Sequence, residues 1–201
     1  ELARDSAVPG MTTAELNRLV EELILDHNAQ PAFKGYRGFP ATICASINEQ
    51  VVHGIPGERR LGDGDLLSVD VGAFHDGYAA DAAITICVGN CNEEALRLAS
   101  VTRRALEEAL KVLRSDIKIS EIGHAIQKTA EEAGYGIVRK YTGHGIGSKM
   151  HEPPQIPNFV SSWPLTGGPE LPRGATVAIE PMLTAGSDHV RELDDGWTVV
   201  T

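Results

Sequence analysis

Two aspartates in a stretch that favours β-structure are the first residues whose type and spacing suggest chemistry. Asp70 lies between two strand-forming valines, although aspartate is depleted in strands, and Asp81 follows eleven residues later. A two-residue turn at Asp76–Gly77 predicts a hairpin in which Asp81 lies opposite Gly72. The same register places Asp70 opposite Ala83, so the two carboxylates are diagonal neighbours on one face, with α-carbons about 7–8 Å apart. That spacing suits two divalent cations about 3.5–4 Å apart, as in two-metal hydrolases. On spacing alone, a solvated hairpin face that carries two aspartates by chance is an equally good interpretation.

Three histidines and a glutamate follow apolar or glycine-rich segments. His144 lies among alternating glycines, which allow close backbone approach, and His151 follows seven residues later. Glu180 ends an apolar run, where a buried carboxylate without a partner would be costly, and His53 also ends an apolar run. Each feature alone has a structural explanation: a core histidine, or a glutamate that points to solvent. Together with the aspartates they form a hard ligand set that suits Mn, Fe, Co or Zn and predicts metal-assisted hydrolysis.

Composition excludes several classes of protein. The chain has 201 residues with 42% hydrophobic and 23% charged residues, as expected of a globular domain and not of a disordered chain. No apolar run approaches the ~20 residues of a membrane helix. The net charge is −10 and no basic stripe is visible, so direct nucleic-acid binding is not expected. Three cysteines form an odd set without framework spacing, which predicts reduced thiols and a cytoplasmic protein.

The pattern of helices and strands indicates an α+β protein. Thr12 with Glu15 is a capping box that predicts a helix, Asn92 is expected to cap a long helix to about residue 113, and a further capped helix is expected after Ser120. Further strands are expected near 42–47, 137–141 and 175–180, with a last one over 197–201. A faint repeat at an offset of 106 residues relates Glu15 to Glu121, which predicts two similar halves, although chance similarity is a serious competitor.

The ends of the sequence suggest a partial record. The chain begins at Glu1 and stops at Thr201, inside the apparent last strand. We therefore expect residues 1–201 to form a single catalytic domain that is truncated at both ends.

In this order and spacing, the motifs resemble those of the methionine aminopeptidases, and within them the type I group. The matching segments are 46–49, 53–56, Asp70 with Asp81, 143–147 with 151–153, and 179–182. The resemblance covers essentially the whole chain. It implies the pita-bread α+β fold, with two pseudo-twofold-related halves around a mixed antiparallel sheet. It also implies removal of the initiator methionine from the N-terminus of nascent proteins, with the ribosome as a partner.

The resemblance assigns the metal ligands residue by residue. Asp70 is implied to bind one divalent ion through both oxygens, and Asp81 to bridge two ions. His144 and Glu180 are implied to bind the other ion, with Glu180 also taking a proton from the nucleophilic water. The two ions would be Co, Mn, Fe or Zn. The family has a second bridging glutamate on a later strand, which this sequence does not contain.

The resemblance also implies substrate contacts. His53 would contact the scissile amide nitrogen and His151 the scissile carbonyl oxygen, so both would act in catalysis and in substrate binding. The backbone at Asn48 matches a monovalent-cation site. The residues implied for the methionine pocket are Phe33, Tyr36, Phe39, Cys44, Met150 and Trp197.

Two alternatives use the same fold. One is a non-catalytic pita-bread binding module, which would have no need of both aspartates, Glu180 and all three histidines. The other is a sibling hydrolase, a proline-specific aminopeptidase or a creatinase. Such proteins usually carry a large N-terminal domain, and creatinases lack the metal ligands.

Overall fold

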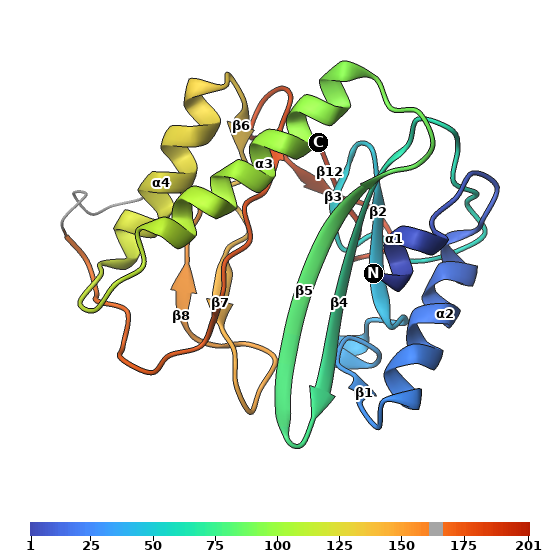
Figure 1. Ribbon diagram of the computed structural model, residues 1–201, viewed down its shortest axis with the longest axis horizontal. Coiled ribbons are helices and arrows are strands. Elements are labelled where there is room, and N and C mark those ends of the chain that lie inside the picture. Colours follow the sequence, from blue (N-terminus) through green and yellow to red (C-terminus); the bar gives the residue numbers. More distant parts are fainter. Residues whose placement is uncertain (161–166) are drawn as a thin grey trace. The chain divides into compact units, whose positions relative to one another are not determined.

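The computed structural model describes residues 1–160 and 167–201 (Figure 1). Its contacts divide the chain into two compact units, each with helices and antiparallel strands. Unit 1 comprises Glu1–Leu96, Ser148–Met150 and Arg191–Thr201, and unit 2 comprises Arg97–Gly147 and His151–Val190. The α+β class expected from the sequence is thus confirmed within each unit.

Unit 1 combines a four-stranded antiparallel sheet, a smaller sheet and two helices. Its elements are α1 (Leu2–Ser6), α2 (Thr13–Asp26), β1 (Gln30–Pro31), the 3₁₀ turn η1 (Tyr36–Gly38), β2 (Ile43–Ile47), β3 (Gln50–Val52), β4 (Leu66–His75), β5 (Tyr78–Cys87), β11 (Arg191–Glu192) and β12 (Val199–Val200). Strand β4 pairs with β5 along one edge and with β2 and β1 along the other. The smaller sheet has the order β11-β12-β3, so the last strand of the chain pairs beside β3. The expected strand over 197–201 is shorter than predicted.

The hairpin of β4 and β5 forms in the register predicted from its turn. Asp76 and Gly77 have φ values of 49° and 82°, the left-handed pair that matches the twist of a two-residue hairpin. The pairing continues without a bulge over ten residues of each strand (Figure 1).

Helix α2 begins at the predicted capping box and covers an apolar face of unit 1. The backbone N–H of Thr12 donates to Glu15 at 2.7 Å, and the backbone N–H of Glu15 donates to the Thr12 hydroxyl at 3.1 Å. Leu16, Val20 and Ile24 are buried and belong to one cluster with residues of β2, β4 and β5. The amphipathic period therefore decides which face of α2 meets the sheet.

Unit 2 contains most of the longest helix, a second helix and two small sheets. Its elements are α3 (Glu93–Lys111), whose first turn belongs to unit 1, α4 (Ile119–Glu132), β6 (Gly136–Ile137), β7 (Gly143–Gly145), β8 (Glu152–Ile156), β9 (Val177–Ala178) and β10 (Leu183–Thr184). Asn92 caps α3 as predicted, because its side-chain oxygen accepts the N–H of Ala95 at 2.8 Å. The sheets have the orders β8-β7-β9 and β10-β6. Strands expected over 137–141 and 175–180 are both shorter than predicted.

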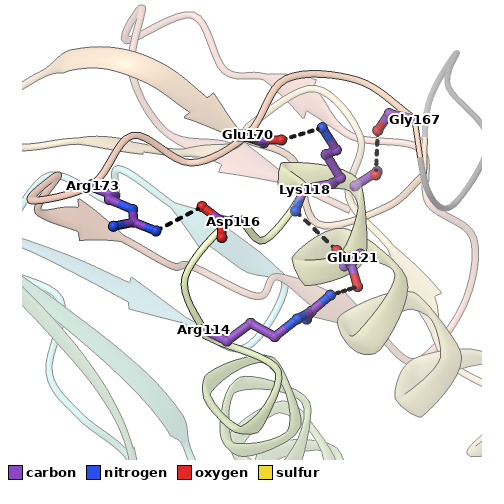
Figure 2. A network of polar contacts seen from close by, with 8 residues as sticks. Arg114, Asp116, Lys118, Glu121, Gly167, Glu170 and Arg173 are labelled. Carbon is purple, nitrogen blue, oxygen red and sulfur yellow. Dashed lines mark hydrogen bonds and ion pairs between the residues drawn. The ribbon is translucent and has the colours of Figure 1, made fainter.

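The start of α4 differs from the prediction. The helix begins at Ile119, and Lys118 occupies the cap position where the backbone N–H donates to Glu121 at 3.0 Å. Ser120 lies inside the first turn, and its hydroxyl donates to the carbonyl of Gly167 at 2.8 Å (Figure 2). The ion pair of Lys118 with Glu170, at 2.8 Å, ties the same turn to a distant segment. With these long-range contacts, the helix cap lies at Lys118, two residues earlier in the sequence than the expected cap at Ser120.

The structure strengthens the faint repeat. The bounds of α4 are those of α2 displaced by 106 residues, and both helices have 14 residues. Before α2, the N–H of Leu61 donates to Met11 at 2.8 Å, and before α4 the N–H of Leu171 donates to Ile117 at 2.9 Å. The two halves of the chain therefore repeat one local arrangement.

Leu61 and Leu171 each lie nine residues before a predicted metal ligand, Asp70 in the first case and Glu180 in the second.

One expectation about the cysteines is wrong. Cys87 and Cys91 form a disulfide bond, whereas Cys44 is free and buried. The bond joins the end of β5 to the loop before α3, a proximity created by the chain reversal after β5.

No helix in residues 1–160 or 167–201 is long and apolar enough to cross a membrane.

Candidate active site

The two aspartates lie on the β4–β5 hairpin of unit 1 as predicted. Asp81 is opposite Gly72, and Asp70 is opposite Ala83. Since directly opposed residues share a face, both carboxylates lie on the same side of the hairpin. A β-carbon on Gly72 would lie 2.6 Å from Cε1 of Phe33, so this face is closely covered beside Asp81.

A buried thiol lies beside the aspartates. Cys44 of β2 pairs with Asp70 of β4. Burial, and then the negative charges of Asp70 and Asp81, raise the pKa of the Cys44 thiol far above its usual range. The thiol is therefore neutral at physiological pH and offers an apolar surface, not a nucleophile.

His53 is held at the end of β3 by the backbone on either side of it. The residue has a φ of 60°, and the next carbonyl, of Gly54, accepts the N–H of Ala45 at 2.8 Å. The N–H of Gly54 donates to the Ser46 hydroxyl at 3.1 Å. Burial lowers the pKa of His53, with Glu192 acting in the opposite direction, so the imidazole is neutral at pH 7.

Trp197 lies beside His53 within unit 1. The Trp197 ring lies 6.4 Å from the His53 ring and 5.1 Å from the Phe39 ring, in edge-to-face arrangements. Tyr36 begins the 3₁₀ turn that Phe39 follows, and its carbonyl accepts the Phe39 N–H at 2.9 Å. Two aromatics of the predicted pocket therefore form a chain of ring contacts with His53, and Tyr36 is joined to them through its backbone.

Two further pocket candidates meet at Gly72. A β-carbon there would lie 3.0 Å from Cε of Met150, in addition to its overlap with Phe33. Both side chains are buried. The Gly72 face of the hairpin thus places apolar groups next to the carboxylate of Asp81.

In unit 2, the structure brings His144 and Glu180 together. His144 lies on β7, between β8 and β9, and its Nδ1 lies 2.8 Å from the carbonyl oxygen of Gly145. A carbonyl only accepts, so Nδ1 carries the proton and Nε2 presents a lone pair in the neutral ring. That Nε2 lies 3.1 Å from Oε1 of Glu180.

The two atoms of the His144–Glu180 contact are close enough for an ion pair, but they do not form a hydrogen bond. Oε1 of Glu180 is a buried atom for which no hydrogen-bond donor is found among the described residues. A lone pair and a carboxylate oxygen facing each other at this distance repel unless a positive charge lies between them. Metal-ligating histidines typically donate the other ring N–H to a backbone carbonyl, as His144 does. The pair therefore fits a divalent cation.

The glycines around His144 allow the strands to approach closely. A β-carbon on Gly145 would lie 2.7 Å from the carbonyl oxygen of Glu152 on β8, and one on Gly143 would overlap the carbonyl of Ala178 on β9. The His151 ring lies 4.1 Å from the His144 ring, and His151 is exposed. An exposed imidazole beside a candidate ligand is placed to contact a substrate.

Comparisons with known proteins agree with this chemistry. The model of metallopeptidase family M24 matches residues 1–200. The chain belongs to this family.

Relatives of the M24 family define the similarity further. A methionine aminopeptidase of Clostridium perfringens is 46% identical over 200 residues, covering 100% of this chain and 79% of the relative. Methionine aminopeptidase 1 of Bacillus subtilis is 46% identical over 193 residues, covering 96% of this chain and 77% of the relative. The crystal structure of a methionine aminopeptidase from Thermotoga maritima matches with a TM-score of 0.95 at 42% identity, covering 99% of this chain and 79% of that one.

A more distant M24 fold match tests the alternatives. The prolidase of Pyrococcus furiosus matches with a TM-score of 0.76 at 26% identity, covering 90% of this chain and 50% of that one. The predicted family, the pita-bread fold and the metallo-aminopeptidase class are confirmed, whereas the binding module and the proline-specific enzyme are not favoured.

Sequence reasoning missed one polar residue at this M24 site. Asn158 is fully buried, and its Nδ2 donates to the backbone carbonyl of Glu180 at 2.7 Å. The only sequence signal is an asparagine inside the otherwise apolar segment 156–160.

Asn48 uses its side chain in the turn between β2 and β3. Its Nδ2 donates to Asp65 at 2.9 Å, and its Oδ1 accepts the N–H of Leu66 at 2.9 Å. The backbone cation site expected there stays a prediction.

Proposed function

We propose that this M24 chain removes the initiator methionine from the N-terminus of nascent proteins as a divalent-metal aminopeptidase. The single observation that carries the chemistry is the contact of His144 Nε2 with Glu180 Oε1; with a neutral imidazole both atoms are acceptors, and a shared divalent cation would stabilise the contact. The substrate is inferred from relatives of 46% identity that are named methionine aminopeptidases.

We propose Asp70, Asp81, His144 and Glu180 as the ligands of two ions of Co, Mn, Fe or Zn. Asp70 would bind one ion through both oxygens, Asp81 would bridge, and His144 with Glu180 would bind the other. A bound ion of this kind polarises a scissile carbonyl and lowers the pKa of a bound water. Glu180 would accept the proton that this water releases. The hard oxygen and imidazole donors support this set over a thiolate site.

The histidines would bind the peptide and stabilise developing charge. His53, neutral at pH 7, would contact the scissile amide nitrogen, and the exposed His151 would donate to the carbonyl oxygen. A donor aimed at a developing oxyanion contributes to rate more than to substrate affinity.

The methionine side chain would lie against the apolar residues beside the hairpin. These are Phe33, Tyr36, Phe39, Cys44, Met150 and Trp197. Aromatic edges and a thioether suit the flexible, polarisable side chain of methionine. A monovalent cation at the Asn48 backbone would support the neighbouring strands.

We further propose that residues 1–201 act as one catalytic domain, in the cytoplasm, on chains that emerge from the ribosome.

Peptide turnover combined with elemental analysis tests the function. The metal-loaded protein should hydrolyse Met-Ala-Ser and leave Ala-Pro peptides intact, with divalent metal bound in the same preparation. Bound metal without Met-Ala-Ser turnover would refute the proposed activity, and cleavage of Ala-Pro in preference would indicate the proline-specific alternative.

A further inference from the structure

Asn158 makes a buried link between two segments of unit 2. The residue has 0% relative exposure and follows β8 by two positions. Its Nδ2 donates to the backbone carbonyl of Glu180 at 2.7 Å, across 22 residues of sequence. The bond therefore joins the end of β8 to the backbone of a proposed metal ligand.

Glu180 needs such an anchor because the sheet does not hold it. The pairing of β7 with β9 ends at His144 and Ala178, two residues before Glu180. Backbone pairing resumes at Met182, whose carbonyl accepts the N–H of Val138 at 3.0 Å. Within the described part of the chain, the contact to the Glu180 carbonyl in this gap comes from Asn158.

Helix α4 fixes Asn158 from its other side. A β-carbon on Gly123 would lie 2.7 Å from the carbonyl oxygens of both Pro157 and Phe159, so the backbone on either side of Asn158 packs directly on the helix. The N–H of Val160 donates to the Gln127 side chain at 2.9 Å. Asn158 therefore connects the backbone of Glu180 to a segment that packs on α4.

The asparagine is a poor choice for stability alone. Among residues 1–160 and 167–201, no group donates to its buried Oδ1. An unsatisfied buried acceptor is unfavourable, and an apolar side chain of the same shape would remove it but would leave the Glu180 carbonyl without this donor. The useful part of the side chain is therefore its donor to Glu180.

We infer that Asn158 is a positioning residue that holds the Glu180 carboxylate opposite Nε2 of His144 for metal binding. This inference rests on the proposed function, in which Glu180 is a metal ligand. Loss of a group that orients a ligand typically lowers metal affinity 10- to 100-fold. The Asn158→Leu variant keeps the approximate shape and removes the donor.

The test is calorimetric titration of Mn²⁺ or Co²⁺ into metal-free protein, with the Co²⁺ absorption spectrum as a report of ligand geometry. Asn158→Leu should bind metal about 10- to 100-fold more weakly and show an altered Co²⁺ spectrum. Thr129→Val is the matched control, since it removes one buried side-chain bond, to Ala125 at 2.9 Å, elsewhere on α4. The control should keep wild-type affinity and spectrum, and the metal-free melting temperatures of both variants separate a loss of metal affinity from a loss of stability.

The outcomes separate the two proposals. Wild-type affinity and spectrum in Asn158→Leu, with a wild type that binds metal, would overturn the positioning role alone. A large fall in metal-free stability with unchanged affinity would also overturn it, in favour of a structural role. A wild type that binds no divalent metal would overturn the proposed function, and this inference with it. Asn158→Ala, which adds no bulk, replaces the leucine variant if that one does not fold.

Discussion

The Gly72→Ala substitution tests whether Phe33 and Met150 form the wall of the methionine pocket. An ideal β-carbon at this position lies 2.6 Å from Cε1 of Phe33 and 3.0 Å from Cε of Met150. Carbon atoms pack favourably at about 3.5–4.0 Å, so the Phe33 ring must move by about 1 Å. Both neighbours are buried, and the change lies opposite Asp81.

The expected loss follows from the cost of overpacking. Inserting a methyl group into a well-packed site typically costs about 1–3 kcal/mol. A substrate that must displace Phe33 again in order to bind meets a cost of the same order, so kcat/KM for Met-Ala-Ser should fall about 5- to 150-fold, at 1.4 kcal/mol for each factor of ten. If kcat/KM falls because KM rises, the displaced side chains obstruct the methionine. If it falls because kcat decreases, Asp81 has moved.

The assay is steady-state hydrolysis of Met-Ala-Ser at saturating metal, with bound metal measured on each preparation. Gly57→Ala is the matched control, because nothing lies within 4 Å of its ideal β-carbon. The control should stay within about two-fold of wild type, the range of a surface substitution. Equal kinetics for Gly72→Ala and the control would refute the role of Phe33 and Met150 in the pocket.

Three further predictions concern the proposed ligands and histidines. Asp81→Asn should reduce Met-Ala-Ser turnover below roughly a tenth of wild type while the circular dichroism spectrum stays native, because a shared carboxylate is lost; higher turnover with metal bound would exclude a bridging role. His151→Ala should retain bound metal and lose roughly 10²–10³ in kcat, the scale for one oxyanion donor; parallel loss of metal would instead make His151 a ligand. The lowered pKa of His53 means that the unfolded chain takes up a proton as the pH falls through the ordinary value of 6.5, while the folded protein does not. The free energy of unfolding should therefore decrease below pH 6.5 and level off once His53 in the folded protein is also protonated. In urea unfolding of the metal-free protein, His53→Gln should remove this decrease, and an unchanged pH dependence would show that His53 is not the group responsible.

Local patterns in the sequence were sufficient wherever the deciding interactions span a few residues. The register of Asp70 and Asp81 followed from the Asp76–Gly77 turn, because a left-handed two-residue turn fixes which residues face each other. The start of α2 followed from the Thr12–Glu15 box for the same reason. The motifs also identified the family, since their residue types and order are themselves the family pattern.

The same local rules failed where distant segments compete. Ser120 carries the usual cap chemistry, yet its hydroxyl bonds to Gly167 and the helix starts at Ile119. The disulfide was missed for a different reason: Cys87 and Cys91 are four residues apart, and their number and spacing do not reveal that the chain reverses between them.

The sequence by itself determined the class of chemistry and the ligand types, because these depend on which side chains are present and in what order. Only the tertiary structure decided that Nδ1 of His144 lies against the Gly145 carbonyl, that its Nε2 faces Oε1 of Glu180 across 36 positions, and that Asn158 bonds to the Glu180 backbone. Dihedral preferences and residue alternation act over a few neighbouring residues, and they leave open which distant backbone carbonyl a side chain will reach. That choice is made when the strands of unit 2 pack on α4, and it converts a list of candidate ligands into a defined site.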